Sequence, residues 1–351
     1  MSEFRNINRN HGRLQLLATV SATALFVAIT AMHRAEADDG ASDRPPFWIE
    51  LGGQYSWIES KQDNFLPPFV LMTPRPSFET TSPLTVEERA PTSWDGNAEI
   101  AFEPEGTDWT ISAAILYGRS SRSRHIVQLT QNPNTSTGIF CAYQNISAQS
   151  SEKHTILDFK AGKDVGLGMG LDSKLSFGVR FVQFNATQSG NFRSQPTNAI
   201  EPLHYSRFNA DLNAYRKFNG VGPSLSWDAS AALVGNRNNG EIAVDWGVNG
   251  AVLFGRQSIR GSQKTTGVPY VGGYTYDIYH HSPSLNRRKN VTVPNLGGFA
   301  GFSWQTSNAK VALGYRADFF FGAMDGGLDT RKAETIGFYG PFASVSVGLG
   351  G

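Results

Sequence analysis

The sequence predicts an all-β protein: an antiparallel transmembrane β-barrel of about ten strands. Three observations lead to this prediction. Apolar residues recur at every second position in many segments, polar and charged residues fill the positions between them, and Trp or Tyr stands near the ends of several apolar faces. A repeat of two residues is that of a β-strand, and a strand with one apolar and one polar face is the unit of a membrane barrel.

The composition of the 351 residues agrees with this fold class. Glycine is frequent, with 37 residues, and charged residues make up 17 % against a usual quarter. The mean hydropathy of −0.30 argues against a multi-span helical protein, whereas a barrel can have this value because half of each strand is polar. The net charge of +1 implies no strongly acidic or basic partner. The single cysteine excludes an intrachain disulfide framework and a multi-cysteine metal site.

The first forty residues have the pattern of a secretory signal peptide rather than of a folded segment. Arginines precede an apolar run at 14–32, which is followed by the small-x-small site Ala35-Glu36-Ala37. We expect a signal peptide over 1–37 with cleavage after Ala37, a short periplasmic lead at 38–46, and a barrel over 47–351. An uncleaved helical anchor is the alternative, because the apolar run is about long enough to span a bilayer.

The clearest strand lies at 240–256. One face carries apolar or small residues, among them Ile242, Val244, Trp246 and Val248, and the other carries Glu241, Asp245 and Asn249. Similar alternation predicts ten strands in all, at 47–57, 93–103, 109–117, 154–164, 175–184, 204–233, 240–256, 296–304, 311–321 and 338–349.

The strand count depends on residues 204–233, which are too long for one membrane crossing of about 9–11 residues. A turn at 218–223 would split them, but it would then place the long segment 257–292 on the same side as the short turns. Membrane barrels have long outside loops and short periplasmic turns. We therefore expect one pass whose first half projects outside, together with long loops at 60–91, 119–152, 187–202 and 257–292. Twelve strands are the alternative, and eight are less favoured.

A secreted β-sandwich would also alternate. Two features argue against it: aromatic residues near the ends of outward faces, and inward faces that are polar on strand after strand, where a sandwich needs an apolar inner face. The aromatic residues are Trp57, Trp94, Trp109, Tyr117, Trp304 and Tyr315.

Several motifs resemble the Legionella-type major outer membrane protein family of porin-like barrels. They are DFKAGKDVGLG at 158–168, LSFGVRFVQF at 175–184, FNGVGP at 218–223 with LSWDAS at 225–230, GYRAD at 314–318 with DGG at 325–327, and GPF at 340–342. The resemblance covers about 155–351. It implies an outer-membrane β-barrel, in its best-known members a pore-forming surface protein, and it brings no catalytic residues.

Thirteen charged residues are expected to face the lumen, eight acids and five bases. They are Asp95, Glu99, Glu103, Asp158, Lys160, Lys174, Arg180, Asp228, Glu241, Asp245, Lys310, Arg316 and Asp318. We predict a porin-like barrel in which they line a narrow channel for small solutes or ions that favours cations; the alternative is a closed barrel filled by mutually neutralising pairs. Both alternatives remain open. The interior of an eight-stranded barrel is just filled by side chains and open aqueous channels need about 16–18 strands, so ten strands lie near the filled end of this range. Arg180 and Arg316 are candidate partners of the acids at 95–103.

Other features support weaker hypotheses. Asp277, His280 and His281 could serve an outer-membrane hydrolase, but no catalytic motif accompanies them, and we expect no enzymatic activity, metal or cofactor. Cys141 is either a reactive outside thiol or a semi-buried small residue. The tyrosines at 270–279 form either an adhesive surface or a packed loop. The filled-barrel alternative gives the outside loops a structural or adhesive role.

The expected partners are outer-membrane lipids, the barrel-assembly machinery and, for an open lumen, small solutes or ions. No nucleic-acid motif is present, and the sequence leaves the oligomeric state open.

Overall fold

The computed structural model describes residues 45–60, 92–104, 106–132, 140–165, 171–196, 205–236, 239–271, 274–275, 279–282, 284–326 and 332–349. The predicted signal peptide, its cleavage site after Ala37 and the connection at 61–91 lie outside these residues. No helix in these ranges has the length and apolarity to cross a bilayer.

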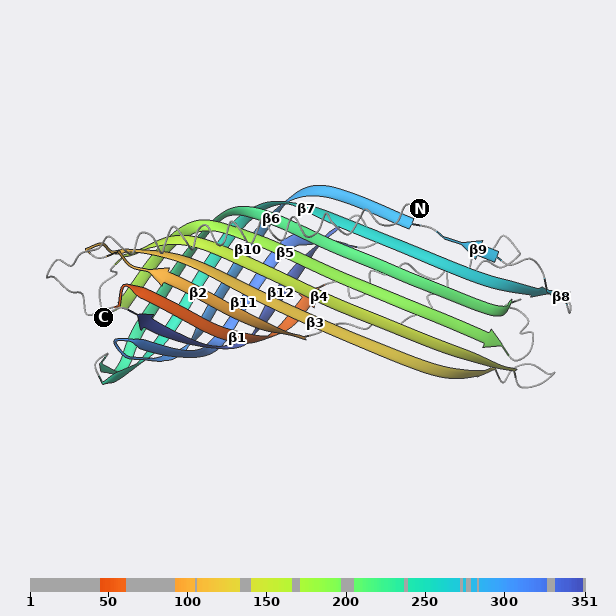
Figure 1. Ribbon diagram of the computed structural model, residues 1–351, viewed down its shortest axis with the longest axis horizontal. Coiled ribbons are helices and arrows are strands. Elements are labelled where there is room, and N and C mark those ends of the chain that lie inside the picture. Colours follow the sequence, from red (N-terminus) through yellow and green to blue (C-terminus); the bar gives the residue numbers. More distant parts are fainter. Residues whose placement is uncertain are drawn as a thin grey trace. The chain divides into compact units, whose positions relative to one another are not determined.

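Ten antiparallel strands form one closed sheet (Figure 1). Each strand pairs with its neighbours in sequence, β7 pairs with β10, and β1 pairs with β12. These pairings close the sheet into a ring. The strands are β1 (Phe47–Ser60), β2 (Thr92–Phe102), β3 (Trp109–Asn132), β4 (Phe140–Asp164), β5 (Leu171–Pro196), β6 (Tyr205–Asn236), β7 (Gly240–Val271), β10 (Ser284–Gln305), β11 (Ala309–Asp325) and β12 (Ala333–Leu349). Two short strands, β8 (Tyr274–Thr275) and β9 (Tyr279–His281), lie between β7 and β10 and pair with β7. The predicted barrel of ten strands is confirmed.

All short connections lie at one end of the barrel, here called the turn end, and the opposite end is the loop end. The turn after β6 depends on two glycines with positive φ, Gly235 at 97° and Gly240 at 105°. A side chain at Gly235 would place its Cβ 2.2 Å from the backbone oxygen of Gly240, so only glycine fits there. The first and last strands also meet at the turn end, where Phe47 pairs with Leu349.

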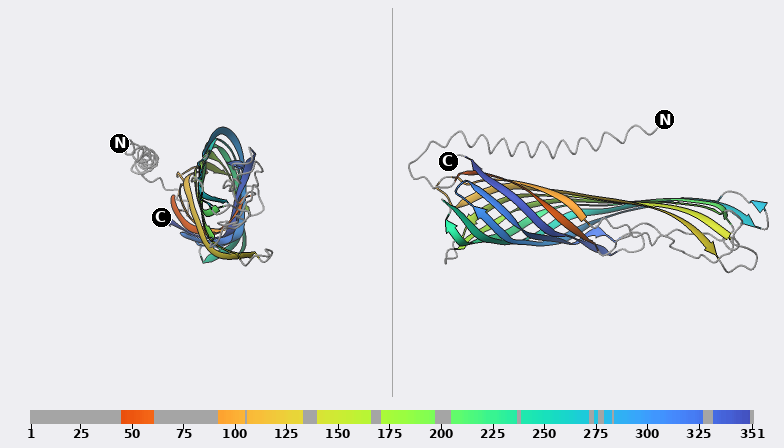
Figure 2. Two further views of the ribbon diagram at one scale, coloured as in Figure 1. Left: turned by 90° about the vertical axis from the view of Figure 1, so that its right-hand side faces the viewer. Right: turned by 90° about the horizontal axis from the view of Figure 1, so that it is seen from below.

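The prediction that 204–233 is one pass is confirmed. β6 runs through residues 218–223 without a turn, with Phe218 opposite Phe184 of β5 and Val221 opposite Phe254 of β7. Beyond the barrel, β3 to β7 continue side by side as a long projecting sheet at the loop end (Figure 2).

The segments predicted as loops at 119–152, 187–202 and 257–292 are strands over most of their length. β3 and β4 remain paired from Trp109 opposite Lys163 out to Asn132 opposite Phe140. These segments look like loops in the sequence because both of their faces carry polar residues. A strand with water on both sides needs no apolar face, since the ladder of backbone hydrogen bonds still satisfies its amides.

The outer surface of the barrel proper is apolar. Large hydrophobic side chains point outward on every barrel strand, with Leu51 61 % and Phe302 63 % exposed. Aromatic residues meet at the loop-end border of this apolar band, where Trp57 stacks with Tyr315 and Tyr339 at 6.5 and 6.1 Å between ring centroids. An apolar band with an aromatic border is the surface that a barrel presents to lipid.

A filled lumen with a cavity at the turn end

The lumen is divided into layers along its axis. At the turn end it holds an open cavity, and further in lie first a polar network and then an apolar layer of buried side chains. Each layer receives one side chain or more from several strands, because alternate residues of every strand point inward.

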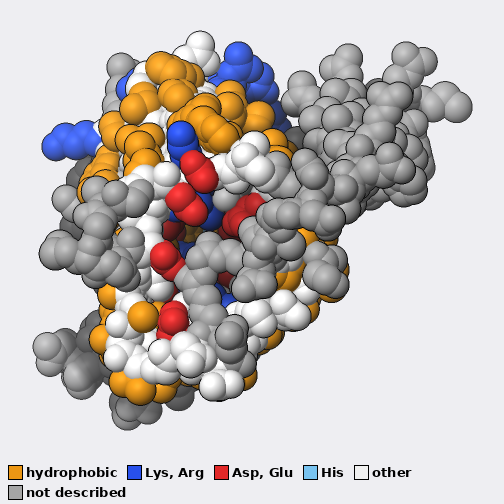
Figure 3. All heavy atoms as spheres, turned by 90° about the vertical axis from the view of Figure 1, so that its left-hand side faces the viewer, with side chains coloured by type: hydrophobic (Ala, Val, Ile, Leu, Met, Phe, Trp, Pro, Cys, Tyr) orange, Lys and Arg blue, Asp and Glu red, His pale blue; other side chains and the backbone are white. Residues whose placement is uncertain are grey.

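The cavity has a volume of about 590 Å³. Seen from the turn end, acidic side chains gather around its mouth (Figure 3). Its lining has seven acids and four bases. These are Glu50, Glu99, Glu103, Asp164, Asp172, Asp228 and Asp245 with Lys160, Lys174, Lys310 and Arg316. The excess of three formal negative charges favours cations in this space.

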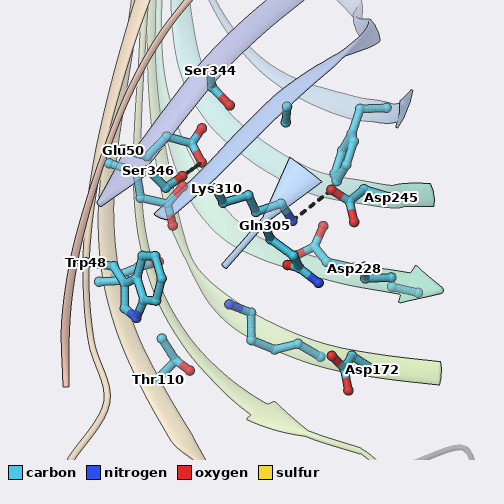
Figure 4. Close-up of a pocket in the computed structure, with 18 of the residues that line it drawn as sticks. Trp48, Glu50, Thr110, Asp172, Asp228, Asp245, Gln305, Lys310, Ser344 and Ser346 are labelled. Atoms are coloured by element: carbon cyan, nitrogen blue, oxygen red, sulfur yellow. Dashed lines mark hydrogen bonds and ion pairs between the residues drawn. The ribbon is translucent and has the colours of Figure 1, made fainter. Parts of the chain in front are cut away.

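Two contacts organise the cavity wall (Figure 4). Lys310 Nζ of β11 lies 2.7 Å from Asp245 Oδ2 of β7, and Ser346 Oγ of β12 donates a hydrogen bond of 2.9 Å to Glu50 of β1. The guanidinium of Arg316 lies 5.3 Å from the ring centroid of Phe342, also in the wall. The acids on the wall are therefore partly neutralised, and the cavity remains polar and open.

Eight of the thirteen charged residues predicted for the lumen line this cavity: Glu99, Glu103, Lys160, Lys174, Asp228, Asp245, Lys310 and Arg316. Glu241 lies four residues closer to the β6–β7 connection than Asp245 does, and it accepts a hydrogen bond of 2.6 Å from Gln305. Asp158, Arg180 and Asp318 lie deeper, in the polar network. Asp95 lies elsewhere, beside His154.

Arg180 of β5 is the centre of the polar network. Its Nε and Nη2 donate to the two oxygens of Asp158 at 2.7 and 2.8 Å. Its Nη1 donates to Asn249 Oδ1 of β7 at 2.8 Å and to Asn295 Oδ1 of β10, and it lies 3.9 Å from Asp318 Oδ1 of β11. One guanidinium thus connects five strands across the lumen. A fork of this kind holds a carboxylate in fixed geometry, which a lysine cannot do.

A glycine opposite Asp318 makes room for this network. Gly297 of β10 pairs with Asp318, and a Cβ there would lie 2.0 Å from Asp318 Oδ1 and 2.9 Å from Asn249 Nδ2. The absence of a side chain at Gly297 lets the carboxylate turn toward Arg180.

An apolar layer lies directly on the loop-end side of the Arg180 network. Phe184 is fully buried, and its ring centroid lies 4.8 Å from that of Phe320, 5.5 Å from that of Phe338 and 6.0 Å from that of Phe218. Buried Ile156, Val182, Leu253, Val293, Met324 and Ile336 complete the layer. The sequence predicts polar inward faces on strand after strand, and here that prediction is wrong, because these inward side chains pack against one another as in a protein core.

Asp95 and His154 form a buried pair beside this layer. Asp95 accepts hydrogen bonds from Ser56 and, at 2.5 Å, from Ser93, and His154 Nε2 lies 3.4 Å from Asp95 Oδ1. The imidazole packs against Phe338 in a tilted arrangement, with 4.0 Å between ring centroids. The partner of Asp95 is therefore His154, and neither Arg180 nor Arg316, which the sequence had suggested.

A second polar layer covers the apolar one at the loop end, beyond the apolar outer band. Arg216 of β6 donates to Glu334 of β12 at 2.9 Å and to the backbone oxygen of Asp325 at 3.0 Å, and Arg287 pairs with Asp325. Burial lowers the pKa of Arg216 and raises the pKa of Glu152, which lies within electrostatic reach of it. The hydrogen bond to Asp325 raises the pKa of Arg287.

Sequence reasoning placed Asn249 on a polar inward face but missed the other residues of these layers, including His154, Arg216, Asn295 and Glu334. Their only signal was inward parity on a strand, which many residues share. The weaker hypotheses gain little. His280 is exposed, whereas Asp277 and the side chains of His281, Cys141 and the tyrosines at 270–279 lie outside the described residues. Within the described ranges, no three His, Cys, Asp or Glu side chains converge to hold a metal ion.

A family model described as the Legionella pneumophila major outer membrane protein precursor matches residues 97–348. No curated protein matches the chain.

Several solved barrels are similar in fold at low identity. Neisserial surface protein A is 11 % identical, with 89 % of this chain and 100 % of that chain covered and a TM-score of 0.23. The transport unit of the autotransporter AIDA-I from Escherichia coli is 9 % identical, covering 90 % and 93 %, with a TM-score of 0.29. The translocator domain of the autotransporter NalP from Neisseria meningitidis is 12 % identical, covering 94 % and 98 %, with a TM-score of 0.27.

Proposed function

The chain belongs to the Legionella major outer membrane protein family and is therefore an outer-membrane β-barrel protein, and we propose that its barrel is closed by its own side chains and displays the projecting strands at the cell surface. The turn end then faces the periplasm, the loop end faces outward, and membrane lipid surrounds the apolar band. Export begins with the signal peptide cleaved after Ala37, and insertion uses the barrel-assembly machinery. The protein acts without catalysis, through its surface.

The observation that carries this proposal is the apolar layer. Phe184, Phe218 and Phe320 have no exposed surface although they lie inside a barrel whose turn end is open to solvent. Water and hydrated ions avoid a constriction lined by aromatic and aliphatic side chains. The Arg180 network beneath it adds a second barrier, since its charged and amide groups bind each other across the lumen.

A narrow channel for small cations is the second candidate, and the cavity at the turn end favours it. The cavity is about 590 Å³, opens toward the periplasm and carries an excess of acids, as an entry vestibule for cations would. A channel would require the apolar layer to part, so this candidate needs a second conformation of the same barrel.

Planar-bilayer recording on the refolded full-length protein tests the proposal. The wild type is expected to show no steady conductance, and the double variant Phe184→Ala, Phe320→Ala is expected to leak measurably more than the wild type, because it removes two rings from the apolar layer and leaves only the Arg180 network in place. The matched control is Phe177→Ala, which changes an outward phenylalanine of the same strand β5.

A steady ohmic conductance of the wild type would refute the closed barrel and favour the channel. In that case, Asp245→Lys should weaken the preference for cations, since Asp245 lies in the cavity wall. An unchanged ion preference in that variant would contradict a cation path through the cavity.

A further inference from the structure

The outward face of the strands carries a basic patch just beyond the apolar band. Three consecutive cross-strand rows run over β3, β4, β5, β6, β7 and β10 in continuous register. The middle row is Arg119, Lys153, Asn185, Lys217, Ser258 and Arg288; the row nearer the turn end is Tyr117, Thr155, Gln183, Asn219, Arg256 and Asn290; and the row further out is Ser121, Ser151, Thr187, Tyr215, Arg260 and Asn286.

The composition of these eighteen positions is one-sided. Six are Arg or Lys, none is Asp or Glu, and the other twelve are Ser, Thr, Asn, Gln or Tyr, all of which form hydrogen bonds. Glu152, beside Lys153, points the other way, into the lumen, and Asp211 shares the outward face of β6 but lies four residues beyond Tyr215, outside the three rows. The patch therefore presents positive charge and hydrogen-bond donors to whatever lies against it.

The cations nearest the apolar band are exposed. Arg119 lies two residues beyond the lipid-facing Tyr117, Arg256 two residues beyond Phe254, and Lys153 four residues beyond Leu157. At about 3.3 Å per residue these cations stand about 7 to 13 Å from the last apolar side chain on their strands. None of the three has a carboxylate partner in the described part of the chain, and Arg256 makes one hydrogen bond of 3.4 Å, to Asn290.

This position coincides with the headgroup layer of the outer leaflet. In the orientation proposed above, the projecting strands lie outside the membrane, so these rows lie where the lipid tails end and the headgroups begin. The outer leaflet of such a membrane is made of glycolipids that carry phosphate groups and sugars. Lys and Arg bind phosphate through charge-assisted hydrogen bonds, and the surrounding Ser, Asn and Gln match sugar hydroxyls.

We propose that the basic patch, with Arg119, Lys153 and Arg256 as its anchoring residues, is a binding surface for the phosphorylated glycolipid of the outer leaflet. The opposite side of the barrel differs, because β1, β2, β11 and β12 carry there the aromatic group of Tyr55, Trp57, Trp94, Tyr315 and Tyr339. The bound glycolipid would therefore lie on one side of the barrel only.

Binding of lipid A by the refolded full-length protein in detergent tests the proposal. The probes are bisphosphorylated lipid A and the same lipid after removal of its phosphates, and the readout is the dissociation constant from thermophoresis. The test variant combines Arg119→Gln, Lys153→Gln and Arg256→Gln. The matched control combines Lys163→Gln, Arg193→Gln and Lys264→Gln. These three cations are exposed, lie away from the three anchoring residues, and their replacement removes the same total charge.

The wild type and the control are expected to bind bisphosphorylated lipid A equally, and the test variant about a hundredfold more weakly, at roughly fivefold for each cation. The variant Arg119→Lys, Arg256→Lys, in which Lys153 is unchanged, keeps all three charges and should keep most of the binding. Equal affinity of the test variant and the wild type would overturn the proposal, as would equal affinity for the lipid without phosphates. Competition by an excess of inorganic phosphate alone would also overturn it, since the site would then bind the free ion.

Discussion

Arg180 gives the sharpest test of how this barrel is held together, and Arg180→Met is the variant that tests it. The methionine has a similar length and no charge, so it leaves Asp158 and Asp318 buried without their cation. Both carboxylates are largely buried, with 8 % and 9 % of their surface exposed. Removing one member of a buried ion pair costs about 3–5 kcal/mol, because the remaining charge is uncompensated.

The geometry divides this cost between charge and shape. Arg180 donates two hydrogen bonds to Asp158 and one each to Asn249 and Asn295. Arg180→Lys retains the charge but cannot reach all four acceptors from one nitrogen, so we expect it to cost about 1–3 kcal/mol. The order of stability is then wild type, Arg180→Lys and Arg180→Met.

Equilibrium unfolding by urea in phospholipid vesicles, followed by tryptophan fluorescence, measures these differences. Arg193→Met is the matched control, because Arg193 lies on the same strand and is exposed. It should stay within about 0.5 kcal/mol of the wild type. Asp158→Asn completes a double-mutant cycle, whose coupling energy should exceed about 1 kcal/mol. A loss below about 1 kcal/mol for Arg180→Met, or an additive cycle, would refute the role given to the network.

Three further predictions use the same unfolding assay. Gly118→Ala should cost about 1–3 kcal/mol, because its Cβ would lie 2.1 Å from Asp95 Oδ1, whereas Gly96→Ala has no atom within 4 Å and should cost nothing; equal effects would contradict this. Leu51→Arg should cost about 2–4 kcal/mol in vesicles, as an arginine facing lipid near the midplane does, and a loss under about 1 kcal/mol would place Leu51 elsewhere. Burial raises the pKa of Glu152 in the folded state, so the wild type should gain stability as the pH falls through that raised pKa; Glu152→Gln should lose this slope, and parallel pH profiles of the two proteins would contradict it.

The barrel could be predicted from the sequence because lipid imposes a simple demand on each strand. Every second residue within the band must be apolar or small, and the segment from Ile242 to Phe254 meets that demand. The single pass at 204–233 followed from the alternation of long and short connections. The projecting sheet could not be predicted, because outside the bilayer no face must be apolar and a polar strand has the composition of a loop.

The closure of the lumen lay beyond the sequence for a different reason. Alternation determines whether a residue points inward, but not which inward residues meet across the barrel. Arg180 reaches Asn249 and Asn295, which are 69 and 115 positions away in the chain. These encounters depend on the stagger of ten strands, and one step of register on any strand would replace the whole set.

The pairing of β1 with β12 sets the order in which this protein can fold. Ile49 lies opposite Val347, nearly 300 residues away in the chain, so the ring cannot shut before the final strand has been synthesised and delivered to the first. Contacts between such distant residues make folding slow, and until they form, β1 and β12 are two bare edges that can pair with other chains. A chain that stops before β12 would therefore be exposed to aggregation and degradation, whereas a substitution within β12 that leaves the seam intact would not. The folding intermediate therefore needs protection from aggregation and proteolysis until β1 and β12 have paired.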